Sequence, residues 1–287
     1  DQAHPIKLVR KDRTFTLVPG SRRMMVDSTM VWLNAPISPL GKKWAMHRVD
    51  VEGLFKPLVD PGTELRDAEA SLVMLDPGHG GADGGGESPN GVKEKGLALE
   101  IAKRVRVHLV NAGVKVKMTR TNDKALPLSE RCVLAGKAGA SLFVSIHCNK
   151  ASNPATEGIE TFVLTAPGFA STSDNGNGEP DRQRYPGHRY APGSGALGFS
   201  IHRDLLHRTG AVDRGLKRAR FVVLREAQSP ACLVECGFLS HEGEEKKLLS
   251  PTYQEELSLA ITQGVLDYLG TVKRAQLALE KVEPFLP

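Results

Sequence analysis

The chain has 287 residues, of which 40% are hydrophobic and 25% charged, and its formal net charge is +5. This length suits one large domain or a large and a small one, and the composition excludes a disordered or fibrous protein. No apolar run is long enough to span a bilayer, and Lys and Arg are spread along the chain, so we expect neither a membrane span nor a nucleic-acid partner.

The first 66 residues contain short apolar stretches separated by turn residues, which predicts β structure. The stretches lie at 15–18, 24–26 and 30–33. Residues 57–66, with Pro57, Pro61 and Gly62, have the composition of a linker. We therefore expect a small β domain or spacer over 1–66, followed by a catalytic domain over 67–287.

From Ala70 onward, predicted strands alternate with predicted helices. Strands are expected at 71–75, 114–118, 142–146, 159–164, 221–224 and 232–234, and helices at 95–111, 129–138, 195–208 and 251–269. This alternation predicts an α/β fold, with a twisted, mostly parallel sheet flanked by helices on both faces and the small N-terminal β unit beside it.

Residues 165–195 are rich in Gly, Pro, Ser, Asp and Asn and are too long for an ordinary connection. They follow the predicted strand 159–164. We expect a functional flap or a disordered insertion, and hypothesise that a flap here gates or contacts the substrate.

Residues that can bind metal follow several predicted strands. His79 lies in DPGHGG (76–81), His147 in SIHCN (145–149) and Glu235 in VECGF (234–238), and Glu94 begins a predicted helix. Ligands of open α/β sheets collect beyond the carboxyl ends of the strands, so these side chains can converge. Two imidazoles and one carboxylate leave one position open on a tetrahedral zinc, which is the pattern of a catalytic site. A second carboxylate beside such a metal indicates hydrolysis by activated water.

Each of these residues also has a purely structural interpretation. A carboxylate at a helix start, such as Glu94, is favoured by the helix dipole alone. Glu235 could instead be an ion-pair partner of Arg214, Lys217 or Arg225. A single His after a strand is usually an ordinary turn residue, but several ligand-type residues at strand and helix ends favour a metal site.

The glycine-rich turn could alternatively bind a nucleotide. The GxGxxG spacing is not met, no Gly-Lys-Ser/Thr follows, and Asp83 would repel a phosphate, so we disfavour that function. The four cysteines include no CxxC pair, which disfavours a structural zinc ribbon. Cys148, Cys232 and Cys236 lie on apolar segments and are expected to be small buried hydrophobes, with any disulfide pairing left open.

These motifs resemble the signatures of the zinc-dependent N-acetylmuramoyl-L-alanine amidases of the Amidase_3 type. The similar segments are 76–81, 93–95, 145–149 and 234–240, with MTRTND (118–123), DRGLK (213–217) and FVVLR (221–225) between them, so that the resemblance covers about 70–270. It implies a twisted sheet flanked by helices and a single Zn²⁺ bound by His79, Glu94 and His147, with Glu235 as the catalytic carboxylate. The implied reaction is cleavage of the amide between N-acetylmuramic acid and L-alanine in peptidoglycan.

The resemblance also implies a role in cell wall remodelling or daughter-cell separation, outside the cytoplasm in the periplasm or cell wall. The expected partners are the glycan strand and stem peptide of peptidoglycan, with a possible protein activator. Residues 1–66 loosely resemble the small β domain of copper-amine-oxidase N-terminal type. Two other functions stay open: a zinc carboxypeptidase or other peptidase acting on stem peptides, and a non-catalytic wall-binding protein or amidase activator.

Overall fold

The computed structural model describes residues 4–65, 71–172 and 180–280. Its centre is a ten-stranded sheet with the order β1-β2-β3-β4-β11-β10-β12-β9-β7-β8. The strands are β1 (Ile6–Arg10), β2 (Arg13–Leu17), β3 (Arg23–Val26), β4 (Thr29–Trp32), β7 (Leu72–Pro77), β8 (Lys115–Met118), β9 (Leu142–Asn149), β10 (Ile159–Leu164), β11 (Asp213–Ala219) and β12 (Ala231–Phe238). A separate hairpin pairs β5 (Ser38–Leu40) with β6 (Lys43–Ala45).

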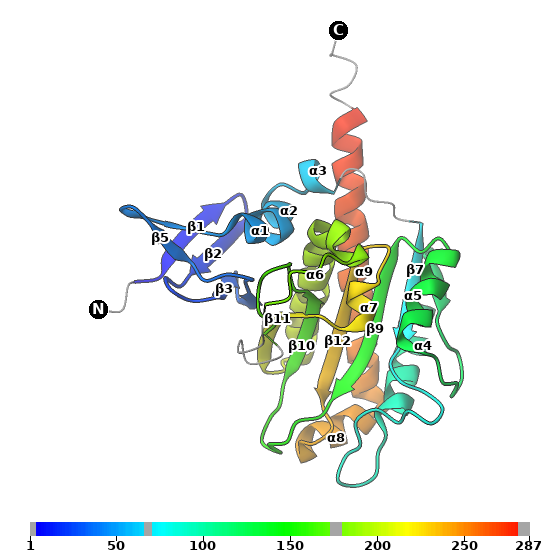
Figure 1. Ribbon diagram of the computed structural model, residues 1–287. Helices are drawn as coiled ribbons and strands as arrows, with labels where there is room; N and C mark the ends of the chain where they lie inside the picture. The colour runs from blue at the N-terminus through cyan, green and yellow to red at the C-terminus, as the bar shows by residue number, and fades with distance from the viewer. Residues whose placement is uncertain (1–3, 66–70, 173–179, 281–287) are drawn as a thin grey trace.

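Helices cover both faces of the sheet, as the sequence predicts (Figure 1). One face packs against α4 (Glu94–Asn111), α6 (Ala191–Thr209) and α9 (Pro251–Glu280). The other face packs against α5 (Leu128–Lys137) and α7 (Val222–Arg225), and α8 (Glu242–Leu249) follows the end of β12. No helix within the described ranges is both long and apolar enough to cross a lipid bilayer.

The strands of the α/β part are mostly parallel. Strands β8, β7, β9 and β12 all run in the same direction, so their carboxyl ends meet at one edge of the sheet. Strand β10 is antiparallel to β12, with Glu160 opposite Glu235, and β11 runs parallel to β10. The beginnings of β10 and β11 therefore lie at the same edge as the ends of β9 and β12.

One predicted strand is wrong. Residues 222–225 form the short helix α7, and the strand is β11 at 213–219, which we did not predict. A short apolar run such as 221–224 does not distinguish helix from strand by periodicity. The polar composition of β11 concealed a strand whose Leu216 and Ala219 are fully buried.

The segment 165–195 begins at the edge opposite the end of β12, because β10 runs antiparallel to it. Phe169 pairs with Asp181 in an isolated bridge, a 3₁₀ helix covers Pro186–Tyr190, and α6 begins at Ala191 rather than at 195. The described flanks therefore do not lie at the edge where the predicted site residues meet, which removes the basis for the flap hypothesis. Residues 173–179 lie outside the described residues.

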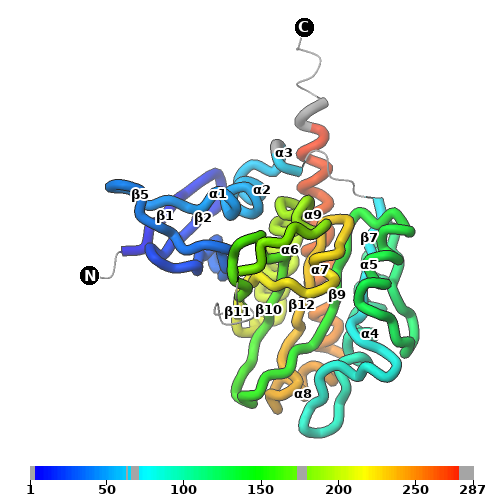
Figure 2. Tube along the Cα trace, viewed as in Figure 1, coloured from blue at the N-terminus to red at the C-terminus, as the bar shows by residue number. Residues whose placement is uncertain are grey.

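The N-terminal region continues the sheet. Strands β1–β4 form an antiparallel meander, and β4 pairs in parallel with β11 through Val31 and Leu216. In Figure 2 the N-terminal part, in blue, lies at one side of the larger part of the chain. Phe15 and Met24 are fully buried in the same apolar core as the helices of the larger part. The predicted linker is partly helical, with α1 (Arg48–Asp50), a π-helical turn (Val51–Phe55), α2 (Lys56–Val59) and α3 (Pro61–Glu64). The small β unit is confirmed, and the domain boundary near residue 66 stays a prediction.

Candidate metal centre

The structure brings His79, Glu94 and His147 together at the edge where β7 and β9 end. Each offers one ligand atom, and these atoms all lie within 4.8 Å of one another. The two imidazole rings are nearly perpendicular, at 83°, with centroids 5.0 Å apart. Among the described residues, this is the group of His, Cys, Asp or Glu side chains with the spacing of a metal site.

A tight turn after β7 aims the His79 ring. The backbone of His79 has φ 59°, in the left-handed region that non-glycine residues rarely adopt. Arg131 donates to the carbonyl oxygen of His79 over 2.8 Å, and its side chain is 2% exposed. Arg120 donates to the carbonyl oxygen of Gly78 over 2.6 Å. These two arginines, which the metal prediction did not include, hold the turn against the sheet.

Asp83 fixes which nitrogen of His79 faces the site. The Nδ1 atom lies 2.8 Å from Asp83 Oδ2, while Nε2 lies 3.1 Å from Glu94 Oε1. A metal-binding imidazole commonly donates its second nitrogen to such a carboxylate, which sets the tautomer. A Cβ at Gly85 would lie 2.6 Å from the ring of His79 and 2.6 Å from Glu94 Oε2, so glycine is needed there. The sequence contained this signal as an acidic residue four positions after the histidine.

Glu94 is held by backbone donors at the first turn of α4. Its Oε2 accepts from the amide of Gly86 over 2.7 Å, and its Oε1 accepts from the amide of Cys148 over 3.1 Å. Burial opposes ionisation, but hydrogen bonds from His147 and His79 outweigh it and hold the pKa of Glu94 well below its usual range. Glu94 is thus a buried carboxylate anion between two imidazoles, rather than an exposed acid at a helix start.

A chain of polar side chains orients His147. Its Nδ1 lies 2.8 Å from Glu94 Oε1, and its Nε2 lies 3.2 Å from Ser145 Oγ. Ser145 in turn donates to Asp76 Oδ2 over 2.7 Å, and Arg131 donates to Asp76 Oδ1 over 2.8 Å. Asp76 therefore connects His147 to the arginine that holds the His79 turn.

Glu235 lies on β12 with its backbone opposite His147 on one side and Glu160 on the other. It is 9% exposed, and its buried Oε2 has no hydrogen-bond partner among the described residues. Burial, with the negative charges of Glu94 and Glu160, raises the pKa of Glu235. A buried carboxylate without a partner is costly, and such groups concentrate at functional sites.

The structural alternative for Glu235 is wrong. The guanidinium of Arg214 and the ammonium of Lys217 both pair with Glu160, at 2.6 and 2.9 Å. The guanidinium of Arg225 lies over the ring of Tyr185, with its carbon 5.0 Å from the centroid. All four cysteines are buried and free, which confirms the prediction for the three on apolar segments.

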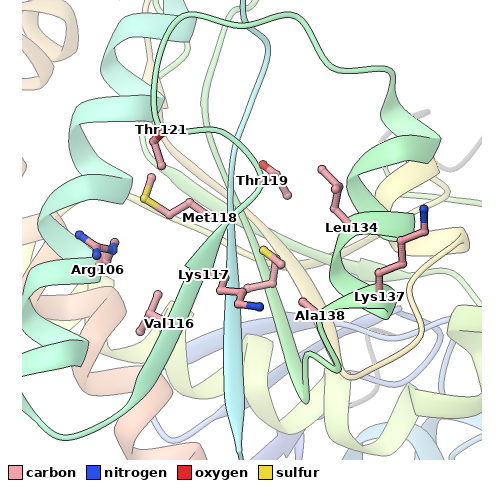
Figure 3. Close-up of a pocket in the computed structure, with 10 residues that line it drawn as sticks. Arg106, Val116, Lys117, Met118, Thr119, Thr121, Leu134, Lys137 and Ala138 are labelled. Atoms are coloured by element: carbon pink, nitrogen blue, oxygen red, sulfur yellow. The ribbon is translucent and has the colours of Figure 1, made fainter.

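A surface hollow elsewhere in the molecule has different chemistry. It lies beside the edge strand β8, between α4 and α5, and Arg106, Lys117 and Lys137 are among its lining residues (Figure 3). No carboxylate or imidazole lines it. It therefore offers neither the His/carboxylate ligands of a metal site nor a carboxylate or imidazole for acid–base catalysis.

Comparison with known proteins agrees with this geometry. The family model for N-acetylmuramoyl-L-alanine amidase, Amidase_3, matches residues 73–267. The amidase AmiA of Salmonella typhimurium is 33% identical over 218 residues, which cover 69% of this chain and 75% of AmiA. The crystal structure of an N-acetylmuramoyl-L-alanine amidase from Clostridium difficile 630 is 36% identical, with a TM-score of 0.59, covering 70% of this chain and 97% of that one.

A third similar protein is the CwlD amidase from Clostridioides difficile, solved in complex with the GerS lipoprotein. It is 27% identical with a TM-score of 0.59, covering 70% of this chain and 98% of that one. The chain described above belongs to the N-acetylmuramoyl-L-alanine amidase family, Amidase_3. Its function is that of a peptidoglycan hydrolase, which cleaves the amide bond between N-acetylmuramic acid and L-alanine in the cell wall.

Proposed function

We propose that this amidase is zinc-dependent and that His79, Glu94 and His147 hold the ion. Their ligand atoms within 4.8 Å of one another, together with the orientation of His79 by Asp83, support a site of two nitrogens and one carboxylate oxygen. This donor set suits zinc and leaves a position open for catalysis. When bound, zinc supplies Lewis acidity that activates water and polarises the amide carbonyl.

Glu235 is the acid–base group of the proposed mechanism. Its carboxylate takes a proton from the attacking water and delivers it to the amide nitrogen of L-alanine as the bond breaks. Burial and the negative charges of Glu94 and Glu160 raise the pKa of Glu235, which makes its carboxylate a stronger base towards the proton of the water. The absence of a partner for its Oε2 among the described residues leaves that atom free to hold the proton.

One observation carries the proposal: Glu235 on β12 is paired with His147 on the neighbouring strand β9, and the other two candidate ligands lie beside His147. Mass spectrometry of digested sacculi tests it. An amidase releases intact peptides that begin with L-alanine and leaves muramic acid with a free carboxyl group. A stem-peptide peptidase would shorten the peptides and leave them attached, and a non-catalytic wall-binding protein would release nothing.

We further propose that the protein acts outside the cytoplasm, in the periplasm or cell wall, because its substrate is there. The complex of the similar CwlD with GerS supports the proposal of a protein activator. Residues 1–66 are proposed to form a spacer or wall-contact unit. Its loose resemblance to the copper-amine-oxidase N-terminal type stays a prediction.

A further inference from the structure

Four strands present polar residues in one row on the open part of the sheet. Glu235 of β12 is opposite His147 of β9 and Glu160 of β10, and Lys217 of β11 is opposite Phe162, two residues beyond Glu160. Paired residues in a sheet point to the same face, as do residues two apart along a strand. The candidate ligand His147, the unpaired Glu235 and the Glu160–Lys217 ion pair therefore share one face.

A β-bulge adds Arg214 to this row. Ile159 pairs with Asp213 but Thr161 pairs with Leu216, so β11 contains one residue more than β10 between these pairs. The extra residue lets Arg214 and Lys217, three apart, both reach Glu160, although a regular strand would point them to opposite faces. The regular alternation of faces along β11 is thus broken where the break adds a second cation beside Glu160.

The N-terminal β unit backs this bulge. Gly215 has φ +96°, and a Cβ there would lie 2.8 Å from the Trp32 ring, so glycine is required. The Trp32 indole donates to the carbonyl oxygen of Arg214 over 3.2 Å. Strand β4 therefore holds the backbone that aims Arg214.

The charges of this cluster do not balance. Arg214 and Lys217 share the single carboxylate of Glu160, which is 5% exposed at its side chain. Arg214 is 34% exposed at its side chain, and its guanidinium carbon lies over the Phe238 ring, 5.0 Å from the centroid. Within the ion-paired group of Glu160, Arg214 and Lys217 one positive charge is in excess, and Arg214 is the member that solvent can reach and that neighbouring side chains hold in position.

We propose that Arg214, with Lys217 beside it, is a specificity-determining residue that binds a carboxylate on the peptide part of the substrate. This inference rests on the proposed function. The carboxyl group of muramic acid forms the amide that is cut and is therefore uncharged in the substrate. The peptide always carries at least its C-terminal carboxylate, so the two cations are complementary to the peptide. A guanidinium binds a carboxylate through two parallel hydrogen bonds, which adds geometric selectivity.

The strand spacing sets which carboxylate is in reach. Strand β11 lies two strands from β12, or about 10 Å from Glu235 across the sheet. An extended peptide advances at most about 3.5 Å per residue. The recognised carboxylate therefore lies within two or three residues of the bond that is cut.

The test uses the full chain with zinc bound and two pairs of synthetic substrates. These are an N-acetylmuramoyl dipeptide and tripeptide, each made with a free C-terminal carboxylate and as the C-terminal amide. We expect the wild type to favour the carboxylate form of at least one pair by roughly 10- to 100-fold in kcat/KM, the size of a hydrogen-bonded charge contact. Arg214→Gln should abolish that preference, mainly by raising KM for the carboxylate form, while zinc content stays unchanged.

Control variants separate recognition from structure. Arg208→Gln removes a guanidinium on α6 that pairs with Glu256 on α9, away from this row, and should keep the preference. Lys217→Met should reduce the preference in part, and it serves as the test if Arg214→Gln does not fold. Arg214→Lys keeps the charge but not the paired donors, and should show an intermediate preference.

Two results overturn the inference. A wild type that cleaves the carboxylate and amide forms equally well has no such recognition, although the proposed amidase function stands. Equal preference in the wild type, Arg214→Gln and Lys217→Met would show that the cations only neutralise Glu160. A wild type with bound zinc that cleaves none of the four compounds, and releases no peptide from sacculi, would instead contradict the proposed function.

Discussion

The two halves of one face of the sheet differ sharply, although the same strands form both. In the half where these strands begin, Met74, Phe143 and Leu233 are buried under α5 and α7 in an apolar cluster. Two residues further along the same strands, the same face carries Asp76, Ser145 and Glu235. The helices therefore cover the first half, and the second half is left for polar side chains that bind each other or a ligand. If the two halves are independent, substitutions in the polar half should change metal binding and chemistry, and substitutions in the apolar half should change stability.

The largest effect is expected at the metal ligands. His147→Ala should lose most of the bound zinc and with it the activity, because two remaining ligands hold zinc poorly. Metal analysis of the purified protein measures this directly. His108→Ala is the control, since His108 pairs with Glu255 on the other side of the sheet and should keep its zinc. Full zinc content in His147→Ala would remove His147 from the site.

Glu235→Gln should separate chemistry from metal binding. The amide nearly preserves the shape of the carboxylate but cannot accept the proton, so we expect a rate loss of about 10²–10⁴-fold with zinc content and fold retained. The loss should fall on kcat more than on substrate binding. Steady-state kinetics on muramoyl peptides measure both. A variant with near-native turnover would exclude Glu235 from the mechanism, and one that loses zinc would make Glu235 a ligand.

The apolar half should affect stability instead of chemistry. Phe143 is 1% exposed, and Phe143→Ala should cost about 3–5 kcal/mol of unfolding free energy because it leaves a cavity under α5. The folded fraction should still bind zinc and cleave substrate. Denaturant unfolding, with zinc analysis of the folded protein, checks both points. If Phe143→Ala folds stably but without zinc, the two halves are coupled and the comparison fails.

The smallest effect is expected at the opposite edge, near His188. Burial is the main cause of the lowered pKa of His188. The imidazole accepts a hydrogen bond from the amide of Tyr185 through Nδ1, and its Nε2 contacts the carbonyl oxygen of Thr165. The pKa of His188 in the folded state lies below its unfolded value of about 6.5. Neutral His188 therefore contributes its full stability at pH values above about 6.5, and this stability is lost as the pH falls through the pKa of the folded state.

Hydrogen exchange over Pro186–Tyr190 should therefore show weaker protection at pH 5 than at pH 7, after correction for intrinsic rates. His188→Gln should remove this pH dependence. Loss of zinc over the same pH range in the wild type but not in His188→Gln would show that this edge controls the metal centre, contrary to the comparison.

Much of the site could be predicted because its residues are adjacent to strong local patterns. His79 and His147 follow buried apolar runs, and in parallel strands such ends meet at one edge. The partners that orient them were harder to find. Arg131 is in the middle of α5 and contacts the turn of His79 only because that helix packs over β7. Asp83 was noted as a charge but not as the residue that fixes the tautomer of His79.

The errors have a common physical cause. The reversed direction of β10 moves the segment after Leu164 to the far edge, and strand direction is set by packing rather than by the strand's own residues. Likewise, the pairing of β4 with β11 joins residues far apart in the sequence, so no local pattern could predict it. Strand β11 itself was missed because its composition is polar and because the bulge at Arg214 and Gly215 interrupts its alternation.

The sequence by itself determined the alternation of strands and helices, the family and the four residues proposed for chemistry. These depend on local hydrophobic periodicity and on side chains at strand ends, which are properties of short segments. The tertiary structure decided the direction of β10, the unpaired state of Glu235 and the position of Arg214 beside Glu160. These depend on which strands become neighbours, and that is settled by the packing of the whole chain.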